Sequence, residues 1–166
     1  VLPSNSNIIM AANSACEHSD KTCAVVASKS VPQSFAAMFA FNENACFDEN
    51  LEAMAEAIGE VKTGEVTRAI KESKDAHGNP IHEGDMIGIA DGSIEAVGNN
   101  ITDVVIDLLS AMDADEFDNL TLLAGEDLSD EELESLEETI EAKFDELEID
   151  PHRGGQPLYP LVFSLE

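Results

Sequence analysis

Positive charge is scarce in this sequence: 8 lysine and arginine residues stand against 35 aspartates and glutamates, which gives a net charge of -27. A surface of this kind repels polyanions, so nucleic acid and anionic membranes are unsuitable partners. No apolar run approaches the roughly 18 residues that a membrane helix needs, and no basic segment followed by an apolar stretch marks a secretory signal. We expect a soluble chain without membrane insertion. Excess acid is also a common means of solubility, so the charge alone implies no partner.

Motifs for nucleotides and catalysis are missing as well. The sequence contains neither the G-x-x-x-x-G-K-[ST] phosphate loop nor the G-x-G-x-x-G fingerprint, and it lacks the G-x-S-x-G turn of a hydrolase nucleophile. His77 and His82 flank the turn at 78–80, but no cysteine or carboxylate spacing completes a metal set around them. We therefore expect no catalytic residue, no metal and no cofactor in this chain.

The cysteines are few and odd in number. Cys16, Cys23 and Cys46 lack any C-x-x-C spacing. Because free cysteine is a common buried residue, we interpret all three as reduced core residues rather than as a disulfide or a metal site.

The length of 166 residues and an apolar fraction of 43% predict a single domain over residues 1–166. The chain begins Val1-Leu2-Pro3 without an initiator methionine. We interpret these residues as the tail of a strand, and the chain as a fragment of a longer protein.

Helix and strand patterns alternate in the first sixty residues. Apolar spacing predicts helices over residues 4–18 and 48–60, and Pro32 suits the first turn of another helix between them. The apolar run at residues 23–27 is typical of a buried parallel strand.

The middle of the chain changes character. Residues 65–70, 86–91 and 93–97 have the pattern of strands separated by glycine-rich turns, and Asp91-Gly92 predicts a tight hairpin. An amphipathic helix capped by Asn100 is then predicted over residues 101–112.

The last third predicts strands at residues 119–124, 146–149 and 160–165, with a capping box at Ser129 and Glu132 before another helix. Alternation at both ends of the chain favours an α/β fold: a mainly parallel sheet with helices on both faces and the middle hairpin as an antiparallel extension. We interpret the acidic outer face of the last helix as solvated rather than as a docking surface.

Polar loops follow three of the predicted strands, where α/β folds bind ligands. Residues 3–7, 28–33 and 125–127 form these loops, and the first two are nearly free of acid. The local absence of acidic residues fits a pocket for an anion or a carboxylate. Helix capping alone, however, also selects serine and asparagine at these positions. The candidate binding residues in these loops are Ser4, Asn5, Asn7, Lys29, Pro32 and Gln33.

The loop before the last strand is the most informative one. Gly154 and Gly155 permit positive φ, and Arg153 and Gln156 supply donors. Tyr159, the only tyrosine, is an interface anchor if it is exposed and a brace if it packs inward. We expect this loop and the first two polar loops to share one sheet edge, with Arg153 and Gln156 facing solvent. The alternative is a purely architectural connection.

The segments VLPSNSNIIMAA, KSVPQ, GEVTRAIKES, EGDMIGIADG and GGQPLYP occur in this order over essentially the whole chain. In this respect the sequence resembles the C-terminal domain of bacterial fatty acid kinase, a dihydroxyacetone-kinase-like family related to the DegV proteins.

The resemblance implies a DegV-like fold, a cytoplasmic location and a place at the C-terminal end of a longer kinase. In such a kinase ATP and magnesium belong to the N-terminal domain, and this fragment has no catalysis of its own. The resemblance further implies that the fragment recognises a DegV-like fatty-acid-binding protein, whose acyl carboxylate the other domains phosphorylate. Two alternatives stay open: a stand-alone binder of small ligands or anions, and a structural domain that forms a homodimer.

Overall fold

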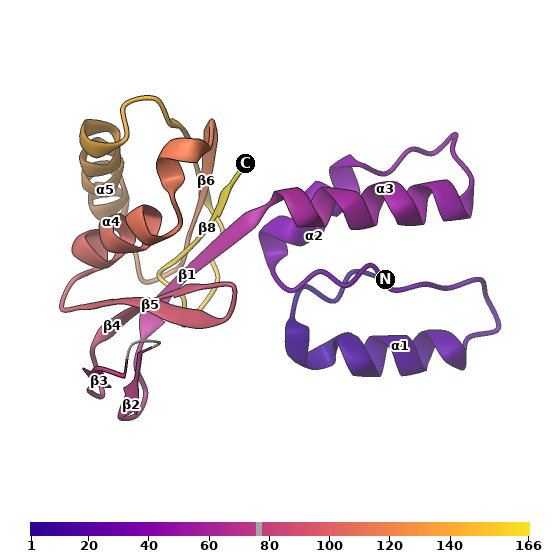
Figure 1. Cartoon of the computed structure of the whole chain (residues 1–166), viewed down its shortest axis with the longest axis horizontal. Helices are drawn as coiled ribbons and strands as arrows, with labels where there is room; N and C mark the ends of the chain where they lie inside the picture. The colour runs from indigo at the N-terminus through magenta and orange to yellow at the C-terminus, as the bar shows by residue number, and fades with distance from the viewer. Residues whose placement is uncertain (76–77) are drawn as a thin grey trace. The chain divides into compact units, whose positions relative to one another are not determined.

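The computed structural model describes residues 1–75 and 78–166, which fall into two compact units, Val1–Val61 and Lys62–Glu166 (Figure 1). The single domain over residues 1–166 stays a prediction. His77 lies outside the described residues. Within the described ranges, no helix has the length and apolar character needed to cross a membrane.

The first unit is helical. A 3-10 helix, η1 (Ser6–Ile8), leads into α1 (Ile9–Glu17), and α2 (Val31–Phe39) packs beside α3 (Phe47–Glu60). Ser30 caps α2 by accepting a hydrogen bond from the Gln33 N–H, with Pro32 in the first turn as predicted.

The prediction of a strand at residues 23–27 is wrong, because these residues do not form one. Its backbone nevertheless pairs once with the start of the chain, because Val1 N donates to Ala24 O and Val26 N donates to Val1 O, over 2.8 and 3.0 Å. One such pair has the parallel pattern but is too short to form a ladder. The apolar run therefore predicts the extended backbone correctly, but within the described residues this segment has no neighbouring strand long enough to form a ladder with it.

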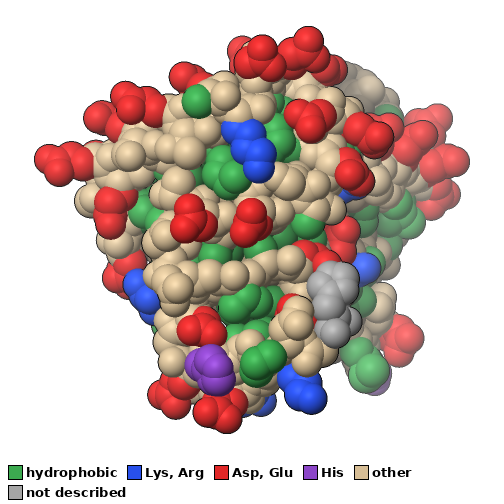
Figure 2. Space-filling model, turned by 60° about the vertical axis from the view of Figure 1, so that its left-hand side comes forward, with side chains coloured by type: hydrophobic (Ala, Val, Ile, Leu, Met, Phe, Trp, Pro, Cys, Tyr) green, Lys and Arg blue, Asp and Glu red, His purple; other side chains and the backbone are tan. Residues whose placement is uncertain are grey.

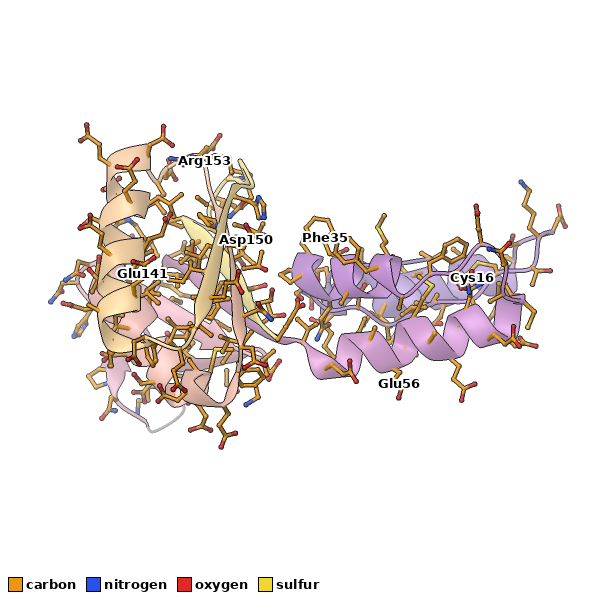
Figure 3. The ribbon with its side chains drawn as sticks, turned by 90° about the horizontal axis from the view of Figure 1, so that it is seen from above. Cys16, Phe35, Glu56, Glu141, Asp150 and Arg153 are labelled. Atoms are coloured by element: carbon orange, nitrogen blue, oxygen red, sulfur yellow. A yellow bond between two sulfur atoms is a disulfide. The ribbon has the colours of Figure 1, made fainter. Side chains whose placement is uncertain are left out.

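The interpretation of three reduced core cysteines is also wrong. Cys16, labelled in Figure 3, forms a disulfide with Cys23, and Cys46 is free and exposed. The chain reverses after α1 and brings the two Cα atoms to 5.2 Å, which is within disulfide range. Cysteine spacing in the sequence does not reveal this reversal.

The second unit is built on a six-stranded sheet in the order β5-β4-β1-β8-β6-β7. Two short strands form a separate antiparallel pair, and two helices and a 3-10 turn complete the unit. The elements are β1 (Lys62–Arg68), β2 (Ser73–Lys74), β3 (Pro80–Ile81), β4 (Met86–Ala90), β5 (Ser93–Gly98), α4 (Ile101–Ala111), η2 (Ala114–Glu116), β6 (Asn119–Ala124), α5 (Asp130–Lys143), β7 (Glu148–Arg153) and β8 (Leu161–Leu165).

The α/β class is confirmed, but the mainly parallel sheet is not. Only β6 and β7 pair in parallel, and the other four pairings are antiparallel. The short connection at residues 154–160 returns the chain as β8 between β1 and β6, antiparallel to both. A parallel neighbour would need a longer crossover.

The two helices cover one face of the sheet rather than both (Figure 1). One core unites α4 and α5 with alternate residues of the strands, including Leu122 and Phe163, both fully buried. A smaller cluster around Ile81 and Ile87 occupies the opposite face. The predicted local features are present: the hairpin at Asp91-Gly92, the Asn100 cap and the capping box of α5.

Figure 2, with the side of α4 and α5 turned forward, shows acidic side chains scattered across the visible surface and few basic ones. The acidic residues Asp130, Glu131 and Glu132 fill the first turn of α5. Their carboxylates suit the positive end of a helix dipole.

Candidate functional site

A groove of about 860 Å³ lies within the second unit. The end of β1, the start of β4, the loop before β8 and the turn between β6 and α5 border it. Most of its lining is apolar, including Ala69, Ile70, Met86, Leu158 and Pro160. This volume lies within the range of ordinary binding pockets.

The loop at residues 154–160 is fixed where it crosses the end of β6. Gly154 N and Gly155 N both donate to Ala124 O, over 2.9 and 3.0 Å. Gly125 N donates to Pro160 O, and Glu126 N donates to Gln156 O. Gly155 has φ of +66°, as its two-glycine sequence predicts. Backbone bonds on both sides therefore give the loop one defined shape.

Leu158 stands out in this loop because its backbone is left-handed, with φ of +70°, although it is not a glycine. Its carbonyl accepts a 2.6 Å hydrogen bond from the Thr67 hydroxyl, and its side chain is 75% exposed. The left-handed conformation costs a leucine about 1–2 kcal/mol. Strained residues that a fold retains cluster at functional sites.

Two basic residues enter the groove from the end of β1. Arg68 donates a 3.4 Å hydrogen bond to Gly84 O, and for Lys71 the described parts of the chain offer no hydrogen bond or ion pair. On the side of α5, the carboxylate of Glu132 is held by Ser129, whose hydroxyl and backbone N–H lower its pKa. The charged lining is therefore divided: Arg68 and Lys71 lie on the β1 side of the groove, and Asp127 and Glu132 lie on the side of α5.

The phenol of Tyr159 lines the groove, and the carboxyl group of Glu65 is close enough to affect it. Partial burial raises the pKa of Glu65 in β1. Burial, followed by the nearby Glu65 carboxylate, raises the pKa of Tyr159. The half-buried Tyr159 is thus closer to the bracing role than to a fully exposed anchor.

We expect Arg153 and Gln156 to face solvent, but their side-chain donors form hydrogen bonds within the second unit. Arg153, labelled in Figure 3, binds Asp130 at the start of α5 and the Leu128 carbonyl. The Gln156 amide donates to Leu123 O at 2.7 Å and to Tyr159 O at 3.2 Å. These contacts give both residues an architectural role, and their contact with a partner stays a prediction.

The two polar loops of the first unit do come together. Ser4 N donates to the Ser28 hydroxyl at 3.0 Å, and the Ser34 hydroxyl lies 2.6 Å from that of Ser4. Asn5 caps the turn at Asn7. These bonds favour the capping interpretation of the serines and asparagines over an anion pocket.

The second polar loop is organised around the start of α2. The Gln33 side chain accepts a hydrogen bond from Lys29 N at 2.8 Å, and Pro32 is buried in the first turn. Arg153, Gly154, Gly155, Gln156 and Tyr159 belong to the second unit. One sheet edge shared by all three loops therefore stays a prediction.

The residues that give the groove its character are absent from the candidates that the sequence offers: Arg68, Ile70, Lys71 and Leu158. Arg68 to Lys71 lie within GEVTRAIKES, and clustered cations in so acidic a chain are a signal that could have found them. The left-handed backbone of Leu158 leaves no such signal. In the described ranges, no three His, Cys, Asp or Glu side chains are grouped to hold a metal ion.

Comparisons with known proteins agree with this fold. The FakA-like family of fatty acid kinase C-terminal domains matches residues 1–166. Protein YloV of Bacillus subtilis is 40% identical, and the uncharacterized proteins SAR1202 of Staphylococcus aureus and SH1689 of Staphylococcus haemolyticus are 32% and 31% identical. Each alignment covers all of this chain and 30% of the relative, so the chain spans less than a third of their length.

Among solved structures, a DegV-family protein of Ruminococcus gnavus with vaccenic acid has a TM-score of 0.60 at 14% identity. The likeness covers 100% of this chain and 70% of the other, and it confirms the predicted DegV-like fold. From the match over its full length, the chain belongs to the FakA-like family of fatty acid kinase C-terminal domains.

Proposed function

We propose that this chain is the partner-recognition part of a bacterial fatty acid kinase and binds a DegV-like protein that carries a fatty acid. The acyl carboxylate of the bound lipid is then phosphorylated by an ATP-binding domain elsewhere in the longer protein. The observation that carries the proposal is the family match over residues 1–166, in a chain that spans 30% of its relatives.

The chemistry of the proposed reaction divides the work. An acyl carboxylate oxygen attacks the γ-phosphorus of ATP and forms a new phosphorus–oxygen bond, while the bond from that phosphorus to the β,γ-bridging oxygen breaks and ADP leaves with that oxygen. Such a transfer depends mainly on positioning and on magnesium and cationic groups around the phosphates. We assign ATP and magnesium to the kinase domain and assign the positioning of the carrier to this chain. Its location in the cytoplasm, where ATP is available, is part of the same proposal.

Isothermal titration calorimetry tests the proposal directly. The longer protein is titrated with a DegV-family carrier from the same genome, loaded with fatty acid, and the same titration is repeated after residues 1–166 are deleted. We expect saturable binding that the deletion abolishes. Equal affinity with and without this region would refute the recognition role, and magnesium-dependent ATP turnover by the purified chain alone would refute the assignment of ATP to another domain.

Dimerisation is the second candidate, because the first unit exposes much apolar surface. Nine of the eleven exposed large hydrophobic side chains in the described residues fall within residues 1–47. Extended apolar patches commonly mark contacts with other protein. Sedimentation equilibrium of the longer protein and of the chain alone distinguishes a homodimer of this region from contacts with other domains of the same kinase.

A further inference from the structure

The second unit exposes two large apolar side chains in its described residues, and both border the same groove. Ile70 is 86% exposed and Leu158 is 75% exposed. They come from segments 88 residues apart, the chain after β1 and the loop before β8. Their meeting at one groove is therefore a property of the fold and not of one apolar loop.

The fold also holds Leu158 in place at a cost. Its left-handed backbone is fixed by the hydrogen bond from Thr67 and by the bonds that tie the loop to the end of β6. A glycine would adopt this backbone without strain. The fold therefore exposes a leucine side chain at a position where the left-handed backbone favours glycine.

Charge indicates what kind of surface fits here. Arg68, Lys71 and Lys74 are three of the eight basic residues of the chain and lie within seven positions that hold one acidic residue, Glu72; Arg68 and Lys71 line the groove. Figure 2 shows basic, apolar and acidic side chains together in the lower part of the unit, where β2 and β3 lie. A partner carboxylate is attracted to the β1 side of the groove by Arg68 and Lys71, and Asp127 and Glu132 repel it from the α5 side.

The placement of the apolar groups distinguishes a protein from a small lipid. Pockets for small ligands bury most of the ligand among inward-facing apolar side chains. Ile70 and Leu158 instead project from the rim, where only a partner broad enough to cover the rim would bury them. Interfaces between proteins have this arrangement, with exposed apolar anchors beside charged groups.

From these observations we propose that the groove is the docking surface for the carrier protein and receives a segment of it that places an apolar side chain between Ile70 and Leu158 and a carboxylate at Arg68 and Lys71 on the β1 side. The inference rests on the proposed function and adds to it the surface and the chemistry of the partner segment.

The central variant is Leu158→Gly, because it removes the side chain and relieves the backbone strain at the same time. The variant should melt no lower than the parent protein, while its affinity for the carrier falls about tenfold or more, as at interface hot spots. Ile70→Ser should weaken binding similarly. Lys71→Glu should weaken it further and reduce its dependence on salt, since the attractive charge is reversed.

Matched controls come from the first unit. Phe39→Ser removes an apolar side chain that is 89% exposed, and Lys21→Glu reverses an exposed charge. Neither change should alter carrier affinity by more than about twofold, the scale of near-neutral surface positions. All variants are titrated as the longer protein with the fatty-acid-loaded carrier.

The outcomes separate the two ideas. If the parent protein does not bind the carrier, the proposed function fails and the docking groove fails with it. If the parent binds and the groove variants bind equally well, only the docking groove is refuted. If the groove variants change affinity for free vaccenic acid but not for the carrier, the groove is a lipid site and the protein docking surface is likewise refuted.

Discussion

Replacing Gly125 with alanine should disturb the loop that borders the groove. Gly125 is buried at the end of β6, and the loop at residues 154–160 crosses directly over it. A methyl group at this position would lie 2.3 Å from Tyr159 O and 2.7 Å from Gln156 O. Both are backbone atoms, which cannot rotate aside as a flexible side chain can, so the loop itself must move.

The size of the effect follows from what the loop would lose. Overpacking in a well-packed region costs about 1–3 kcal/mol. Movement also lengthens the bonds from Gly125 N to Pro160 O and from Glu126 N to Gln156 O, each of which contributes about 0.5–1.5 kcal/mol. Movement of the loop relieves the overpacking but weakens these hydrogen bonds, so the two costs do not add in full. We expect the free energy of unfolding to fall by about 2–3 kcal/mol. For a unit of about 100 residues this corresponds to a melting temperature lower by about 10–20 °C.

The assay uses the fact that the chain has one tyrosine and no tryptophan. Tyrosine fluorescence therefore reports on Tyr159 in the loop, and thermal unfolding followed by this signal measures the second unit. Gly59→Ala is the matched control, because no atom lies within 4 Å of the added methyl and the residue lies in α3. It should leave the Tyr159 transition unchanged. A Gly125→Ala protein that melts within about 3 °C of the parent, well short of the expected shift, would refute the argument.

Three further changes test other parts of the structure. Because burial raises the pKa of Glu65, the folded state binds more protons than the unfolded state between about pH 4.5 and that raised pKa, and stability falls as pH rises through this window. Glu65→Gln should therefore raise the melting temperature at pH 8 but not at pH 4. Absorbance titration of the same variant should show a lower Tyr159 pKa, and an unchanged pKa would contradict the effect of Glu65 on the phenol. Arg153→Ala should lower the free energy of unfolding in urea by about 1 kcal/mol, because it removes the donor to the Leu128 carbonyl. An unchanged stability would contradict the architectural role of Arg153. Reaction with Ellman's reagent should count one thiol, Cys46, before reduction and three afterwards; three at the outset would contradict the disulfide.

Local sequence signals predict the elements of this fold well and their neighbours poorly. The cap at Asn100, the capping box at Ser129 and the hairpin at Asp91-Gly92 all depend on residues within a few positions, and all three are present. The direction in which strands pair depends on contacts far apart in sequence. The apolar residues at 161–165 indicate a buried strand, but not that it lies antiparallel between β1 and β6.

The candidate site divides in the same way. The two glycines before Gln156 predict a loop with a defined shape, and Gly155 has the expected positive φ. The polar side chains of the loop suggest contact with a partner, but Arg153 and Gln156 are occupied by carbonyls nearby. The groove depends on Ile70 and Leu158 meeting across the fold, and each of them alone is an ordinary apolar residue.

The central place of β8 also affects how the second unit can be made. Strands β5, β4 and β1 form one half of the sheet, β6 and β7 form the other, and β8 alone joins them. During synthesis residues 161–165 are the last strand of this sheet to appear, and until then the edges of β1 and β6 that they pair with are open. Such edges favour pairing with other chains. Pairing with other chains is therefore most favoured in the interval before β8 is added, and loss of β8 would leave two half-sheets and not a slightly shorter protein.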